Sequence, residues 1–167
     1  MSPHEGWVAL LSNQLQAQSL NYHVVNASVS GETTGGGRAR INGTLEIHNP
    51  DVIVLELGGN DGLRGYPIDN IRNNLIDMVK ASQASGAKVL VIGMILPPNY
   101  GRRYTRAFEG LFSDVADRTG VALIPALLDG IDTAPELLQR DGIHPTADAQ
   151  PRLLADIWPA LKTLLPQ

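Results

Sequence analysis

The chain has 167 residues, of which 43% are hydrophobic and 18% are charged, and its formal net charge is −4. This length and composition fit one globular domain, which we expect to cover residues 1–167. The sequence contains no cysteine and no basic run, which excludes disulfides, thiolate metal sites and a cysteine nucleophile and argues against a nucleic-acid surface.

Short apolar runs alternate with helical patterns along the chain. In chain order we predict a helix at 6–19, a strand at 23–27, a helix at 36–48, a strand at 52–57, a helix at 67–85, a strand at 88–93, a helix at 102–119, a strand at 121–124 and a helix at 147–165. The strand segments are short and nearly continuous in apolar residues, which is typical of parallel strands covered on both faces. This alternation predicts a doubly wound α/β fold, in which ligands bind at the carboxyl ends of the strands.

The loop GGNDGLRG, residues 58–65, follows the second predicted strand. Gly58 and Gly59 allow a sharp turn off the strand, and Asn60 then places a side-chain amide at the strand end. A preorganised amide donor can stabilise a developing oxyanion. The structural alternative is that Asn60 and Asp61 only cap the loop.

The loop NASVSGETTGGG, residues 26–37, follows the first predicted strand. The backbone N–H of Gly31 is a candidate second oxyanion donor, because no side chain blocks close approach. A phosphate-binding loop is disfavoured, since the glycines match neither GxxxxGK[ST] nor GxGxxG. The structural alternative is a helix entry capped by Thr33 or Thr34.

The segment RDGIHPTADAQ, residues 140–150, places Asp141 three residues before His144. This spacing suits a carboxylate that orients an imidazole, so that the imidazole can act as a general base. The structural alternative is a capped loop with a surface histidine. A metal site is disfavoured, because the four histidines of the chain show no ligand spacing such as HxxxH.

Together these loops resemble the SGNH-hydrolase (GDSL-type) superfamily, in particular its bacterial thioesterase I, arylesterase and lysophospholipase branch. The resemblance covers essentially the whole chain and rests on VVNASVSGETTGGG, VIVLELGGNDGLRG, LPPNYGRRYTRAF and DGIHPTADAQPRLL. It implies a flavodoxin-like, three-layer α/β/α sandwich with a parallel sheet. It further implies that Gly31 and Asn60 are oxyanion donors, that His144 is the general base and that Asp141 orients it.

The first block of that family, a Gly-Asp-Ser whose serine is the nucleophile, has no counterpart among the 167 residues. The serines present are Ser2, Ser12, Ser19, Ser28, Ser30, Ser82, Ser85 and Ser113. Ser28 and Ser30 lie near Gly31, in a block where the family uses backbone N–H groups, so we expect neither to replace the nucleophile. The start of the chain resembles the segment after the first block, and we expect the nucleophile and the first central strand to be missing.

We therefore predict a hydrolase of carboxyl esters or thioesters that acts on small acyl substrates without a metal or organic cofactor. Two alternatives remain open, namely a non-catalytic descendant that has lost its nucleophile and an unrelated flavodoxin-like ligand-binding protein. The loop PPNYG, residues 97–101, either shapes the substrate pocket or is simply a rigid turn.

The family suggests a periplasmic or secreted location, although the N-terminus carries no signal-peptide pattern. No apolar stretch is long enough for stable insertion into a membrane. A sheet without its first central strand has an open slot, which predicts strand exchange or self-association.

Overall fold

The computed structural model describes residues 5–127 and 134–165, so Ser2 lies outside the described residues. The chain forms two compact units. The first consists of Met1–Ala27 and Leu128–Pro159, and the second consists of Ser28–Leu127 and Ala160–Gln167. The sheet belongs entirely to the second unit.

Three parallel strands form this sheet, in the order β1-β2-β3. They are β1 (Val52–Leu55), β2 (Lys88–Ile92) and β3 (Ala122–Ile124). Val52 pairs with Lys88 across the first ladder, and Leu90 pairs with Ala122 across the second. The strands predicted within 52–57, 88–93 and 121–124 are therefore confirmed.

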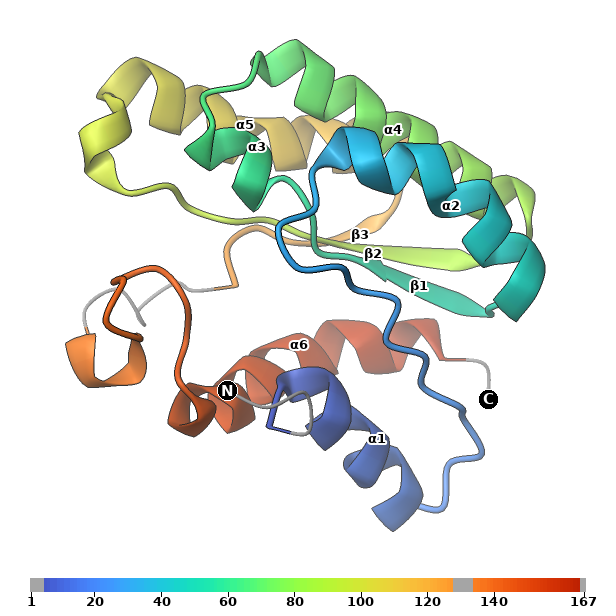
Figure 1. Ribbon diagram of the computed structural model, residues 1–167. Coiled ribbons are helices and arrows are strands. Elements are labelled where there is room, and N and C mark those ends of the chain that lie inside the picture. Colours follow the sequence, from blue (N-terminus) through green and yellow to red (C-terminus); the bar gives the residue numbers. More distant parts are fainter. Residues whose placement is uncertain (1–4, 128–133, 166–167) are drawn as a thin grey trace. The chain divides into compact units, whose positions relative to one another are not determined.

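The helices of the second unit are α2 (Thr34–His48), the short α3 (Gly59–Leu63), α4 (Ile68–Ala84), the 3-10 turn η1 (Pro98–Tyr100) and α5 (Arg102–Thr119). Figure 1 shows α2, α4 and α5 along the same face of the sheet, with α4 packed against both others. The apolar face of α4 recurs at helical spacing through Ile71, Leu75 and Met78. These fully buried side chains share one core with Phe108 and Phe112 of α5.

The prediction of a strand at 23–27 is wrong, because the structure has no strand in this segment. The sheet begins at β1, which pairs only with β2 among the strands of the described residues. An apolar run supplies β propensity, but a strand forms only where its backbone groups pair with a neighbouring strand. Val25 is accordingly 43% exposed, whereas a covered parallel strand would bury it.

The segment 58–65, predicted as a loop, contains the helical turn α3. Gly58 precedes this turn with a φ of +117°, in the left-handed region that favours glycine. Gly58 therefore turns the chain off β1, as the sequence predicted. It delivers Asn60 and Asp61 onto a short helix rather than onto an open loop.

The first unit contains α1 (Trp7–Ala17), the 3-10 turns η2 (Pro135–Leu137) and η3 (Ala147–Ala149), and most of α6 (Gln150–Leu164). The Trp7 backbone N–H donates a hydrogen bond to Gln150 Oε1 at 2.9 Å, which joins the start of α1 to the start of α6. This bond gives the buried Gln150 side chain a partner. None of the helices in the described part of the chain is long and apolar enough to cross a bilayer.

Gly93, which follows β2 directly, offers a test of this fold. A Cβ at Gly93 would lie 2.1 Å from the backbone oxygen of Pro125. The backbone cannot easily yield, because Gly93 N–H donates to the Ile124 carbonyl at 2.7 Å and Leu127 N–H donates to the Gly93 carbonyl at 3.2 Å. We expect Gly93→Ala to lower the free energy of unfolding by about 3 kcal/mol or more, measured by urea denaturation.

Gly110 provides the matched control, because it lies within α5 and a Cβ there would meet nothing within 4 Å. Gly110→Ala should raise the free energy of unfolding by up to about 1 kcal/mol, since alanine is the better helix former. Equal unfolding midpoints for the two variants would contradict the packing described at Gly93.

Candidate active site

Asp141 and His144 lie together in the first unit. Asp141 Oδ2 is 2.7 Å from His144 Nδ1, and Asp141 Oδ1 accepts hydrogen bonds from the backbone N–H groups of Ile143 and His144, both at 3.0 Å. The carboxylate thus caps its own loop and also contacts the imidazole. A proton on Nδ1 completes this contact and leaves Nε2 as the basic nitrogen of the ring.

Backbone hydrogen bonds, rather than burial, hold this pair in place. Leu138 and Pro145 form an isolated antiparallel bridge. Gln139 N–H donates to the His144 carbonyl at 2.7 Å, and Gln139 Nε2 donates to the Pro145 carbonyl at 2.9 Å. The side chains of Asp141 and His144 are 46% and 66% exposed, so the ring remains accessible to a reacting group.

The same contacts lower the pKa of Asp141 to about 2. The largest cause is the hydrogen bond from the His144 backbone N–H, followed by that from Ile143 and then by the His144 ring. Each of these favours the ionised carboxylate. Asp141 therefore stays ionised throughout the pH range in which an imidazole can act as a base.

We expect the Asp141 carboxyl carbon to titrate with a midpoint near pH 2 in carbon-13 NMR of the folded protein. In His144→Ala the midpoint should rise only part of the way to the ordinary 3.8, because both backbone N–H donors remain. Since folding depresses this pKa, the stabilisation is fully present above pH ~4 and is lost as the pH falls through about 2. An ordinary midpoint in the unsubstituted protein would contradict the described hydrogen bonds.

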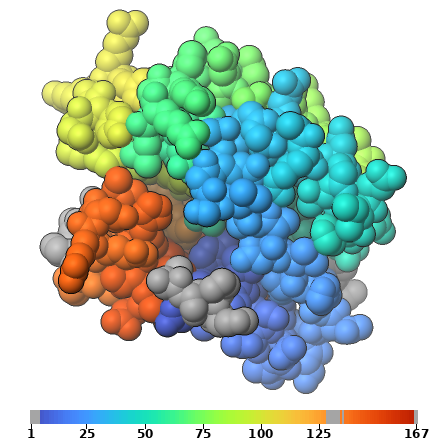
Figure 2. All heavy atoms as spheres, in the orientation of Figure 1, coloured from blue at the N-terminus to red at the C-terminus, as the bar shows by residue number. Residues whose placement is uncertain are grey.

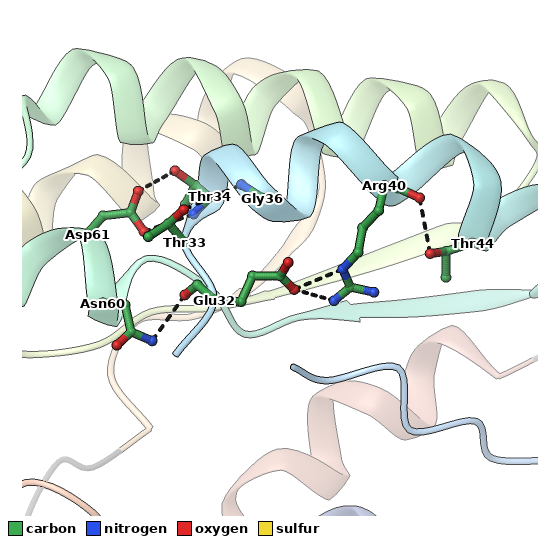
Figure 3. A network of polar contacts seen from close by, with 8 residues as sticks. All are labelled: Glu32, Thr33, Thr34, Gly36, Arg40, Thr44, Asn60 and Asp61. Atoms are coloured by element: carbon green, nitrogen blue, oxygen red, sulfur yellow. Dashed lines mark hydrogen bonds and ion pairs between the residues drawn. The ribbon is translucent and has the colours of Figure 1, made fainter. Parts of the chain in front are cut away.

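Gly31 and Asn60 lie in the second unit and are linked through Glu32, as Figure 3 shows for Asn60 and Glu32. Asn60 Nδ2 donates to the Glu32 carbonyl at 3.0 Å. Gly31 has a φ of +76°, and a Cβ there would meet nothing within 4 Å. A residue other than glycine would be strained at this position, although it would have space. The structure thus places an exposed backbone segment next to a side-chain amide, and both kinds of group can stabilise an oxyanion.

Two arginines that sequence reasoning missed also hold the Gly31 loop. Arg64 Nη2 donates to the Gly31 carbonyl at 3.3 Å. Arg40 Nε lies 2.8 Å from the Glu32 carboxylate, which its Nη2 also contacts, and the Glu32 side chain is only 11% exposed. Figure 3 shows this pair joining the loop to the side of α2. Their sequence spacing follows no local pattern, so only the folded loop brings these partners together.

The helix entry considered from the sequence is also present. Thr33 is the N-cap of α2, and its Oγ1 accepts a hydrogen bond from Gly36 N–H at 3.4 Å. Ser28 and Ser30 precede it as exposed residues without regular secondary structure. Seen as spheres, the start of α2 and the α3 segment touch each other on the surface (Figure 2).

The loop at 97–101 contains η1 and leads into α5. Tyr100 Oη donates to the Leu63 carbonyl at 3.0 Å, which ties this loop to α3. Tyr100 also lines a surface pocket together with Ile68 and Tyr104. Burial and the negative charge of Asp61 raise the pKa of Tyr104. The loop is therefore both a braced turn and one wall of a pocket.

The four predicted site residues thus form two pairs. Asp141 and His144 belong to the first unit, and Gly31 and Asn60 belong to the second. Within residues 5–127 and 134–165, no three histidine, aspartate or glutamate side chains are grouped so that they could hold a metal ion.

Comparison with known proteins gives consistent results. A model of the GDSL-like lipase/acylhydrolase family matches residues 2–150. The chain is 48% identical to Esterase TesA of Pseudomonas aeruginosa over 161 residues. This match covers 96% of the chain and 80% of that protein. The chain is also 40% identical to thioesterase 1/protease 1/lysophospholipase L1 of Escherichia coli K12 over 160 residues. This second match covers 96% of the chain and 74% of that protein.

A solved structure shows the same backbone. The crystal structure of TesA matches with a TM-score of 0.95 and 47% sequence identity, over 99% of this chain and 92% of that one. This likeness confirms the predicted flavodoxin-like α/β fold.

Proposed function

Because the chain belongs to the GDSL-like lipase/acylhydrolase family, a family of ester and thioester hydrolases, we propose that it hydrolyses carboxyl esters or thioesters of small acyl substrates. Membership confirms the resemblance that the loops indicated. Its relatives are named as an esterase and a thioesterase/lysophospholipase, and these names support this substrate class.

In the proposed mechanism a serine attacks the acyl carbon while His144 Nε2 takes its proton. Asp141 holds the tautomer and stabilises the imidazolium that forms. The Gly31 N–H and the Asn60 amide donate to the oxyanion of the tetrahedral intermediate. His144 then protonates the leaving group, and water releases the acyl group in a second cycle.

The contact between Asp141 and His144 carries this proposal. A separation of 2.7 Å between Oδ2 and Nδ1 is the geometry that an orienting acid and a general base require. A loop cap alone would need only the two backbone hydrogen bonds. The additional bond to the ring favours the catalytic role over that of a capped surface histidine.

The nucleophile is proposed to lie outside the 167 residues, which contain no Gly-Asp-Ser. Residues 1–167 would then be the greater part of one hydrolase domain. The chain matches 80% and 74% of the lengths of two relatives, which is consistent with a catalytic segment beyond the matched part. The rival proposal, a non-catalytic descendant, rests on the same absent motif.

The test uses an extended enzyme, defined as residues 1–167 preceded by an apolar strand that ends in Gly-Asp-Ser. We expect it to hydrolyse p-nitrophenyl acyl esters and acyl thioesters, and to lose this activity when the added serine is replaced by alanine. Turnover that survives this replacement would place the nucleophile elsewhere, whereas a folded extended enzyme without any turnover argues for the non-catalytic descendant.

We also propose that the edge of β1 opposite β2, which pairs with no other strand of the described residues, pairs with a second copy of the chain. The three residues Val52, Ile53 and Val54 are only half-buried, although the run is entirely apolar. An unpaired strand edge is a template for pairing with another chain. Sedimentation of the 167-residue chain should therefore show concentration-dependent association.

A lysine on this strand should weaken the association. Ile53 packs against the core that α4 and α5 share, and Val54 is not among the residues packed there, so Val54→Lys is the variant that spares this core. Ile47→Lys is the matched control, because Ile47 is 76% exposed on α2. A monomer at all concentrations would exclude pairing through β1.

A periplasmic or secreted location is proposed as well, on the strength of the family resemblance alone. Fractionation of cells that produce the full-length protein tests it, and recovery in the cytoplasmic fraction would exclude it.

A further inference from the structure

Asp61 is the one aspartate or glutamate among the buried polar residues of the described chain, with 2% of its surface exposed. Its carboxylate accepts two hydrogen bonds from one residue of another segment. Asp61 Oδ2 accepts from the Thr34 backbone N–H at 2.8 Å, and Asp61 Oδ1 accepts from Thr34 Oγ1 at 2.6 Å. Figure 3 shows this double contact between α3 and the first turn of α2.

The charge of Asp61 is stabilised without an ion pair. No lysine or arginine of the described residues forms a salt bridge with it, and its partners are neutral donors at the N-terminus of α2. The N-terminus of a helix of 15 residues carries partial positive charge, which favours a carboxylate there. Asn74 Nδ2 donates to Thr34 Oγ1 at 3.1 Å, so the Thr34 hydroxyl is oriented towards Asp61 from the opposite side.

Capping of α2 does not by itself require Asp61. Thr33 is already the N-cap, and its Oγ1 accepts from Gly36 N–H. A buried ionised group is costly unless it is fully bonded, so a second, charged cap from a segment 27 residues away calls for another role. Its place in the chain indicates that role, because Asp61 adjoins Asn60 and Thr34 lies three residues after Gly31.

We propose that Asp61 is a positioning residue for the oxyanion donors, and that its double hydrogen bond to Thr34 fixes the Gly31 loop against the Asn60 side chain. This inference rests on the proposed function for its catalytic meaning. The hydrogen bond from Asn60 Nδ2 to the Glu32 carbonyl links the Asn60 side chain to the Gly31 loop. Both residues are partly exposed, so water can readily replace either partner of this bond. The buried hydrogen bonds between Asp61 and Thr34 hold the two segments together, so that this weaker bond can form.

The first experiment measures hydrogen exchange by mass spectrometry in the 167-residue chain. Asp61→Asn removes one of the two acceptors, and Thr34→Val removes only the hydroxyl. Both should speed exchange in peptides covering residues 31–37 by about tenfold or more, while peptides covering β2 stay protected. Asp69→Asn is the control, because that carboxylate is 80% exposed and lies elsewhere in the same unit.

The second experiment measures kcat and KM of the extended enzyme. Asp61→Asn and Thr34→Val should lower kcat per folded molecule by about 10- to 100-fold with KM changed less than about twofold, because misplaced donors act only on the transition state. Thr34→Ser, which keeps both bonds, should retain kcat within about threefold. A purely structural role would lower the melting temperature and leave kcat per folded molecule unchanged.

The outcomes separate the two proposals. If the unsubstituted extended enzyme has no turnover, the proposed function fails, and the exchange experiment alone decides whether Asp61 anchors the loop. Unchanged exchange at residues 31–37 in Thr34→Val, or equal kcat in Thr34→Val and Thr34→Ser, overturns the positioning role. Should Asp61→Asn fail to fold, the Thr34 pair still gives the answer.

Discussion

His144→Ala in the extended enzyme is expected to lower kcat for short acyl esters on the order of a millionfold, close to the effect of removing the serine itself. The two residues act as one unit, because a serine hydroxyl is a poor nucleophile until a base takes its proton. The fold should survive, since His144 is 66% exposed at the side chain and its loop is held by backbone hydrogen bonds. Stopped assays at high enzyme concentration measure the residual rate.

Asp141→Asn in the same enzyme is the graded comparison. The loss should be roughly 10⁴-fold, because asparagine cannot hold the ring tautomer or stabilise the imidazolium. The variant should lose both the orientation of the His144 ring and the catalytic rate. Asp148→Asn is the control, because Asp148 is exposed in the next turn and its replacement should leave kcat unchanged. Unchanged turnover in His144→Ala would remove His144 from the mechanism and leave its contact with Asp141 a loop cap.

The helices and three strands of the fold could be predicted because their signals are local. Apolar residues recur at helical spacing in α4, and continuous apolar runs mark β1 and β2. The segment at 23–27 (HVVNA) also contains apolar and β-branched residues, but a strand also depends on a neighbour that no local pattern reveals. The helical turn α3 was missed because two glycines within five residues are typical of a loop, and tertiary packing overrides that propensity.

The candidate site divides along the same line. Asp141 and His144 are three residues apart, so their contact follows from spacing and loop geometry. The hydrogen bonds between Asp61 and Thr34 join residues 27 positions apart, so they depend on the position of the chain at the end of β1 in the folded protein. Nothing in GGNDG distinguishes a solvated aspartate from a buried one, which is why the sequence suggested only a cap for Asp61.

The 167-residue chain itself is expected to show almost no turnover of short acyl esters. Loss of a triad serine costs on the order of a millionfold, and only the weak acceleration from binding and the oxyanion donors remains. Under the proposed mechanism the oxyanion would also lose one donor, because the family resemblance implies that the N–H of the nucleophilic serine contributes. A spectrophotometric assay with p-nitrophenyl acetate, compared with buffer alone, measures this residual rate.

Ser30→Ala decides whether a serine of the chain acts in place of the missing one. Ser30 is exposed and precedes Gly31, but its place in the block is one where the family uses backbone donors rather than a hydroxyl. We therefore expect the unsubstituted chain and Ser30→Ala to share the same background rate, with no burst of acyl-enzyme in either. A burst that disappears in Ser30→Ala would assign the nucleophile to Ser30 and make the 167 residues a complete catalyst.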